Sequence, residues 1–176
     1  MTYIQRVDRS VAIANEFIRL PGGKGLTQMQ LQKLVYFAHG WSLSLANAPL
    51  TTDRVEAWDY GPVYPDLYDH TKFFGKAPIG RLITPDDDEV ARFFSNSKTG
   101  RPPYKADLDS KQRAIISHVS KKYSGLSGAR LSALTHQPGT PWFSVYKNGT
   151  GRNEEIDNNL IQDHYNVIAN RNRAPV

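Results

Sequence analysis

The histidines are the side chains of this sequence best suited to proton transfer or metal binding. The chain has five of them, and they are His39, His70, His118, His136 and His164. No two stand four residues apart as zinc ligands on one helix do, and there is no cysteine to supply a thiolate. The acids from Asp86 to Glu89 follow a threonine and a proline, which is typical of the first turn of a helix. We therefore expect no metal and no other cofactor.

His136 is the histidine whose surroundings most resemble a functional site. It follows Thr135 and precedes a short loop that ends in Pro141 and Trp142. A histidine in this place can act as a general base, with Asp59 as its partner in a small enzyme, or it can tie the loop to a backbone carbonyl. The structural interpretation is favoured because no nucleophile motif such as G-x-S-x-G is present. We expect no catalytic residue and a protein that is not an enzyme.

An aromatic segment from Val55 to Pro65, with the sequence VEAWDYGPVYP, is a second candidate. The residues before its two prolines are restricted to extended geometry, so the segment predicts a rigid, non-helical bend. Its aromatic rings either fill the core or anchor a partner protein. We expect Trp58 to lean toward the core, and Tyr60 and Tyr64 to lie at the surface.

The element that must position these residues is a helix predicted from Thr27 to about Ala46. Thr27 with Gln30 forms a capping box, which marks the start of the helix. Two adjoining apolar faces follow, made of Leu31, Leu34, Val35, Ala38 and Leu45 on one and of Phe37 and Trp41 on the other. A helix that is apolar over so much of its circumference is usually central. Gln32, Lys33 and His39 interrupt its surface and need polar partners or an outlet to solvent. Lys33 and His39 are within reach of the aromatic bend.

Start and stop signals divide the rest of the chain into short helices. We expect these helices at residues 7–20 and 65–74, after Thr84, after Asp109, after Ser127, from Pro141, and after Asp157. The sequence thus predicts a mainly α fold, a compact single-domain bundle of six to eight helices with at most a minor β element. The domain is expected to cover residues 1–170, with a mobile loop outside the core at about 95–106 and a frayed tail at 171–176.

Composition restricts the class of protein further. A mean hydropathy of −0.53 indicates a soluble chain, and no apolar run approaches the roughly 20 residues that span a bilayer. The N-terminus lacks the apolar stretch of a secretory signal, so a cytoplasmic location without membrane contact is expected. The net charge of +5 permits binding of nucleic acid, but no dense run of Lys or Arg indicates it as the primary ligand.

Several of these motifs occur together in a fixed order. They are LTQMQLQKLVYFAHGW at residues 26–41, then PL, then EAWDYGPVYPDLY at residues 56–68, then LTH and PW. In this combination the stretch from about Leu26 to Tyr165 resembles the Panacea domain family, which includes SocA-like and phage-associated GepA-like proteins. The resemblance implies the antitoxin of a bacterial or phage toxin–antitoxin pair.

The resemblance also implies a partner, namely a cognate toxin protein that is encoded nearby and neutralised by direct contact. Some SocA-like members act instead as adaptors that deliver the toxin to a protease, and a protease or chaperone is a further expected partner. The expected partner-binding residues are Tyr60, Gly61, Pro62, Tyr64, His136 and Trp142. The residues expected to maintain the domain are Leu31, Lys33, Leu34, Tyr36, His39, Trp41, Trp58, Thr135 and Pro141. A small enzyme and a nucleic-acid-binding protein remain the alternatives.

Overall fold

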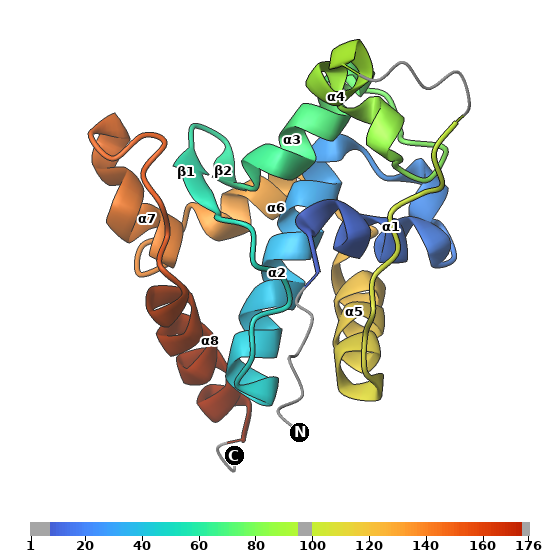
Figure 1. Ribbon diagram of the computed structural model, residues 1–176. Coiled ribbons are helices and arrows are strands. Elements are labelled where there is room, and N and C mark those ends of the chain that lie inside the picture. Colours follow the sequence, from blue (N-terminus) through green and yellow to red (C-terminus); the bar gives the residue numbers. More distant parts are fainter. Residues whose placement is uncertain (1–7, 95–99, 174–176) are drawn as a thin grey trace, which may run out of the picture.

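The helix α2 (Gln28–Ala46) runs through the centre of the computed structural model, which describes residues 8–94 and 100–173 (Figure 1). The capping box is present, because the Thr27 side chain accepts from the Gln30 N–H and the Gln30 side chain accepts from the Thr27 N–H. Every residue from Leu31 to Leu43 is buried, which confirms the central position. Leu45, expected on a buried face, is instead 39% exposed in the last turn.

The other helices surround α2. Those that contact it are α1 (Ser10–Arg19), α3 (Pro65–Thr71), α5 (Ser110–Tyr123), α6 (Gly128–Thr135) and α8 (Asn158–Arg173). The two remaining α-helices of the described residues are α4 (Glu89–Phe94) and α7 (Pro141–Tyr146). Single turns of 3-10 helix are η1 (Gly23–Gly25), η2 (Lys72–Phe74), η3 (Pro85–Asp87) and η4 (Lys147–Gly149). The predicted mainly α fold is confirmed.

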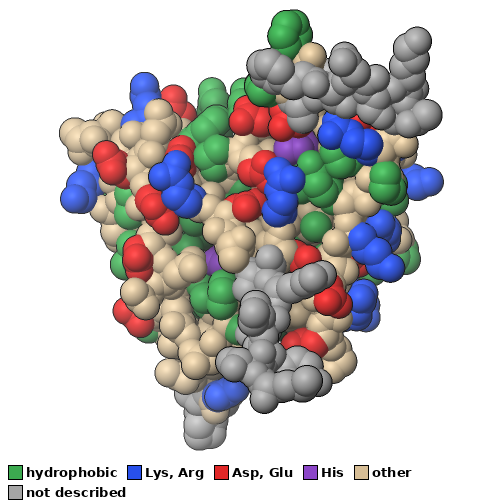
Figure 2. All heavy atoms as spheres, viewed as in Figure 1, with side chains coloured by type: hydrophobic (Ala, Val, Ile, Leu, Met, Phe, Trp, Pro, Cys, Tyr) green, Lys and Arg blue, Asp and Glu red, His purple; other side chains and the backbone are tan. Residues whose placement is uncertain are grey.

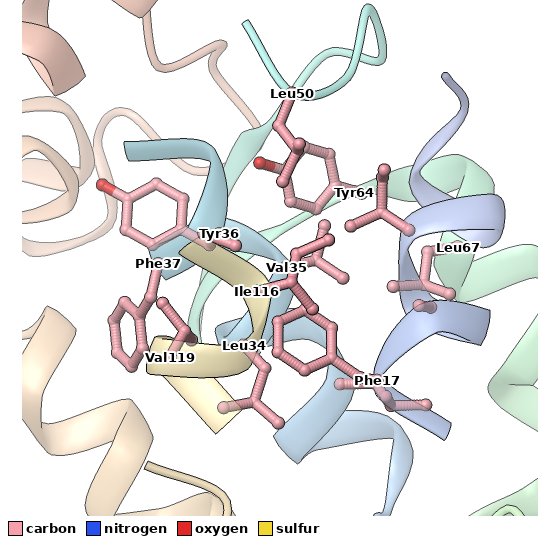
Figure 3. Packing of buried hydrophobic residues seen from close by; sticks show 14 of the residues in the cluster. Phe17, Leu34, Val35, Tyr36, Phe37, Leu50, Tyr64, Leu67, Ile116 and Val119 are labelled. Atoms are coloured by element: carbon pink, nitrogen blue, oxygen red, sulfur yellow. The ribbon is translucent and has the colours of Figure 1, made fainter. Parts of the chain in front are cut away.

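The core forms where α1 and α5 pack against α2 (Figure 3). Leu34 and Val35 of α2 lie between Phe17 of α1 and Ile116 and Val119 of α5. All of these residues except Ile116, which is 3% exposed, have no exposed surface, and each contributes about 1.5–3 kcal/mol of transfer free energy by leaving water. The core therefore fixes the direction of α2, and with it the polar side chains that α2 presents.

The predicted non-helical bend is a small antiparallel hairpin of β1 (Glu56–Trp58) and β2 (Gly61–Val63). Trp58 pairs with Gly61, so Asp59 and Tyr60 form the tip. The outer edge of β1 is held by residues 153–156, since the Ala57 N–H donates to Glu154 O at 2.9 Å. Strands this short are not stable alone, so contacts with the rest of the domain must hold them.

The predicted loop at about 95–106 falls partly outside the described residues, which resume at Gly100. Its last residues are held against the core, because the Tyr104 N–H donates to Ile83 O at 3.1 Å and the Asn15 side chain donates to Tyr104 O at 2.8 Å. Ala106, at the end of the predicted range, is 3% exposed and belongs to the core, whereas residues 100–105 are exposed or half-buried. The mobility of the loop stays a prediction.

The predicted chain ends also fall partly outside the described residues. The helix α8 continues through Arg173, so residues 171–173 are helical where fraying was expected. Residues 174–176 of the predicted tail, and Val7 at the predicted start of the first helix, lie outside the described ranges.

Candidate functional site

Three helices hold the hairpin by hydrogen bonds to its carbonyl oxygens. The three pairs are Trp142 Nε1 of α7 with Trp58 O at 2.8 Å, Ser132 Oγ of α6 with Tyr60 O at 2.6 Å, and Lys33 Nζ of α2 with Pro62 O at 3.1 Å. We call Lys33, Ser132 and Trp142 the hairpin clamp. Each bond adds about 0.5–1.5 kcal/mol net, so the clamp stabilises the seated hairpin by roughly 2–4 kcal/mol.

Gly61 lies where the hairpin comes closest to α2 and α6. Its φ is +105°, and a Cβ placed on it would lie 2.6 Å from Thr135 Oγ1 and 2.8 Å from Lys33 Cε. Only glycine satisfies both the backbone angle and the close approach. Gly61 and Pro62 are buried, so a contribution of either to partner binding would act through the position of the hairpin.

The Lys33 side chain is 1% exposed. Burial lowers the pKa of its ammonium group to about 7. Within the described residues it forms no ion pair, and its hydrogen bond goes to Pro62 O. A neutral amine still donates hydrogen bonds, so this contact to the hairpin persists in both protonation states.

The other side of the hairpin tip rests on an aromatic and ionic cluster. Tyr146 OH donates to Asp59 Oδ1 at 2.8 Å, and Arg152 Nε lies 2.7 Å from the same oxygen. The rings of Tyr146 and Trp142 stack with 4.4 Å between their centroids, and the His136 ring makes an edge contact with the Trp142 ring at a centroid distance of 3.8 Å. The partners of the Asp59 carboxylate are thus Tyr146 and Arg152, whereas the enzyme alternative pairs this carboxylate with His136.

His136 is half-buried beside a cavity of about 630 Å³ that Asp59 and Trp142 also line. Burial lowers the pKa of its imidazole, the charge of Lys33 acts in the same direction, and a backbone hydrogen bond with Asp59 opposes them. Its Nε2 is buried without a hydrogen-bond partner in the part of the chain that the structure describes. The interpretation of His136 as a strut that ties the loop to a backbone carbonyl stays a prediction.

The tip of the hairpin presents one large aromatic ring to solvent. Tyr60 is 70% exposed, as predicted, and it borders a cavity of about 690 Å³ whose walls include Met29, Trp58 and Tyr68. Trp58 is half-buried, with its ring 4.9 Å from that of Tyr68. The site therefore combines a projecting aromatic side chain with a largely apolar hollow beside it.

Tyr64 does not lie at the surface, and that expectation is wrong. It is fully buried, and the Gln32 side chain bonds both its backbone N–H, at 2.8 Å, and its carbonyl oxygen, at 3.2 Å. These two bonds hold the Tyr64 main chain at the end of the hairpin against α2, and the Tyr64 ring packs in the core. Tyr64 is therefore part of the core beneath the site.

His39 does not reach the tip either. Its Nδ1 accepts from the Leu50 N–H at 3.2 Å and its Nε2 bonds Asn158 Oδ1 at 2.8 Å, while its ring lies 6.3 Å from that of Tyr64. Burial lowers the pKa of His39. It thus joins α2 to the following loop and to α8. The other residues expected to maintain the domain are buried, namely Leu31, Leu34, Tyr36, Trp41, Thr135 and Pro141.

Residues 8–94 and 100–173 contain no group of three or more His, Asp or Glu side chains placed to hold a metal ion. The acids that follow Thr84 begin η3, where the Thr84 N–H donates to Asp87 Oδ2 at 2.7 Å. Arg81 Nη2 lies 2.6 Å from the same carboxylate. The interpretation of this cluster as a helix start is confirmed.

Positive and negative side chains are intermixed over the face in Figure 2. Several charged side chains of the described residues form ion pairs, as Arg101 does with Asp86 at 2.7 Å. This face therefore offers no extended basic patch of the kind that follows a nucleic-acid backbone. In the described part of the chain, no helix has the length and apolar character needed to cross a bilayer.

Sequence reasoning missed Ser132, Tyr146 and Arg152. Ser132 stands one helical turn before Thr135, and Tyr146 stands one turn after Trp142, so both share a helix face with a motif residue. That spacing was a usable signal for these two residues. Arg152 carries no such signal, because its position next to Asp59 depends on the turn after α7.

Comparison with known proteins agrees with the motif order. A family model described as antitoxin SocA-like, Panacea domain, matches residues 31–143. Antitoxin SocA of Caulobacter vibrioides (strain NA1000 / CB15N) is 32% identical over 129 residues, which are 73% of this chain and 63% of that protein. The chain thus spans less than two thirds of the length of this curated relative. No solved structure gives a significant match.

Proposed function

Because the chain belongs to the antitoxin SocA-like Panacea domain family, we propose that it is an antitoxin that neutralises a toxin protein by direct binding. The partner is expected to be encoded beside it, and the pair to act in the cytoplasm. The proposed binding surface is the hairpin tip with the cavity that it borders.

The observation that carries this proposal is an exposed aromatic ring on a fixed hairpin. Tyrosines are prominent among the residues that dominate binding energy in protein interfaces. Tyr60 stands on a hairpin that the clamp already holds, so binding costs little further ordering. Full burial of a tyrosine ring of this exposure would contribute roughly 2–3 kcal/mol.

The test is co-expression of this chain with the product of the neighbouring reading frame, followed by co-purification and measurement of the affinity. If the neighbour alone stops growth and this chain restores it in a stable complex, neutralisation by contact is supported. Tyr60→Ala should weaken the complex about tenfold or more. Phe93→Ala on α4, which removes a ring that is 84% exposed, is the matched control and should leave the affinity unchanged.

Two outcomes would revise the proposal in different ways. Wild-type affinity in a folded Tyr60→Ala variant would refute the hairpin as the binding surface, while rescue of growth would still support the antitoxin role. Disappearance of the toxin from rescued cells would indicate an adaptor that delivers it to a protease. Loss of rescue in His136→Ala with toxin binding retained would support an enzyme.

A further inference from the structure

A second surface lies over α2 between α5 and α8, the two helices that flank α2 in Figure 1. Two cavities of about 430 and 710 Å³ adjoin there and share Trp41 and Lys122 as lining residues. We call this surface the α5–α8 groove. It shares no lining residue with the cavity beside Tyr60, so it is separate from the hairpin site.

The α8 residues that line the groove recur at helical spacing, and two of them are exposed apolar residues. Along α8 the residues Leu160, His164, Val167 and Arg171 line it at intervals of four, three and four residues. The inward side of α8 has its own stripe, which includes Ile161 and Tyr165. The groove is also lined by exposed or half-exposed apolar residues of three helices, Leu45 at 39%, Leu134 at 38%, Leu160 at 37% and Val167 at 49%. Leu160 and Val167 thus leave apolar surface on α8 that packing against α2 does not cover.

The charged side chains that line the groove are mostly cationic. Lys111 and Lys122 of α5 and Arg171 and Arg173 of α8 line it, and Asp163 is the one acid among the lining residues. Within residues 8–94 and 100–173, none of these four cations forms an ion pair with a carboxylate. Exposed apolar side chains with charged residues beside them are typical of a protein interface.

We propose that the α5–α8 groove binds an amphipathic helix of a partner protein, with an apolar stripe flanked by acidic residues. Intervals of four and three residues are those at which helices pack against each other, so a helix fits between α5 and α8 better than an extended strand. The α8 stripe from Leu160 to Arg171 is about 16 Å long, which corresponds to about three turns of the bound helix. Its glutamates or aspartates would face the four cations.

The proposal does not depend on the antitoxin role and is testable with a synthetic probe. The probe is a fluorescein-labelled, stapled helix of about 16 residues, with leucines at heptad positions a and d and glutamates at e and g. Its control carries lysines at e and g. By fluorescence anisotropy the acidic helix should bind at least tenfold more tightly than the basic one, and its affinity should fall as salt is raised.

Variants locate the binding surface. Val167→Glu should reduce the affinity about tenfold or more, because it places a charge in the apolar centre. The pair Lys111→Glu and Arg171→Glu should reduce it about tenfold. The pair Lys24→Glu and Lys105→Glu makes the same charge change at exposed sites outside the groove, and should reduce it less than threefold.

Three results would overturn the proposal. These are equal affinity for the acidic and basic helices, full affinity in the Val167→Glu variant, and loss of affinity in Tyr60→Ala, which would place the helix at the hairpin. A concentration-dependent dimer in light scattering that Val167→Glu dissociates would assign the groove to a second copy of this chain.

Discussion

Replacement of Gly61 by alanine tests whether the hairpin is seated as closely as the structure shows. Two costs add at this position. The first is conformational, because a φ of +105° is unfavourable for a residue with a Cβ by roughly 1–2 kcal/mol. The second is steric, because the Cβ would lie 2.6 Å from Thr135 Oγ1 and 2.8 Å from Lys33 Cε, and such overpacking costs about 1–3 kcal/mol. The free energy of unfolding should fall by about 2–5 kcal/mol.

Gly139 supplies the matched control. Its φ is +85°, and nothing lies within 4 Å of a Cβ placed on it, so Gly139→Ala carries only the conformational cost. Urea unfolding of both variants, followed by circular dichroism, should therefore separate them by about 1–3 kcal/mol. Equal destabilisation of the two variants would refute the close approach of the hairpin to α2 and α6.

Two further predictions concern buried polar groups. The pKa of Lys33 is about 7 in the folded chain and near 10.4 in the unfolded chain. Between these two pH values the unfolded state binds more protons than the folded state. The free energy of unfolding of the wild type should therefore rise by up to about 1.4 kcal/mol per pH unit from this group above pH 7. The Lys33→Met variant should lack this rise. The midpoints of urea unfolding of both proteins, measured from pH 7 to 10, test the difference, and midpoints that change in parallel with pH would contradict the prediction. Asn15 donates to Ile83 O at 2.9 Å and accepts from the Ile83 N–H at 2.7 Å, so Asn15→Ala should cost about 2–4 kcal/mol. Hydrogen exchange at the Ile83 amide should accelerate in this variant. Unchanged protection of that amide would argue against the two hydrogen bonds between the Asn15 side chain and the Ile83 main chain.

The helical elements were predictable because their signals are local. The capping boxes at Thr27 and Asp109, the caps at Ser127 and Thr140 and the apolar periodicity each depend on residues within a few positions of one another. Such signals survive in the folded chain because the core reinforces them. The mainly α class followed from them without knowledge of any long-range contact.

The details of the site were less predictable because they depend on distant residues. The two prolines indicate a bend, but they do not predict whether the Tyr64 ring faces the core or the solvent. The Tyr64 main chain is held against α2 by Gln32, which lies 32 residues earlier. The strand β1 is similarly stabilised by residues 153–156, which sequence reasoning had no cause to place there. The end of the loop is held against the core by a hydrogen bond from the Asn15 side chain to Tyr104 O, and these two residues are 89 positions apart in the sequence.

The clamp holds the hairpin only through its main chain, because all three hydrogen bonds of the clamp go to main-chain oxygens. The carbonyls of residues 58, 60 and 62 accept these bonds whatever side chains those positions carry. Position 61 must remain glycine, since two helices crowd it. The side chain of residue 60 is free of such constraints, because it points into solvent at 70% exposure. The fold therefore separates the residues that hold the hairpin from the residue that it presents. Under the proposed antitoxin role, we expect a change of partner to require changes at the tip without any change in the clamp.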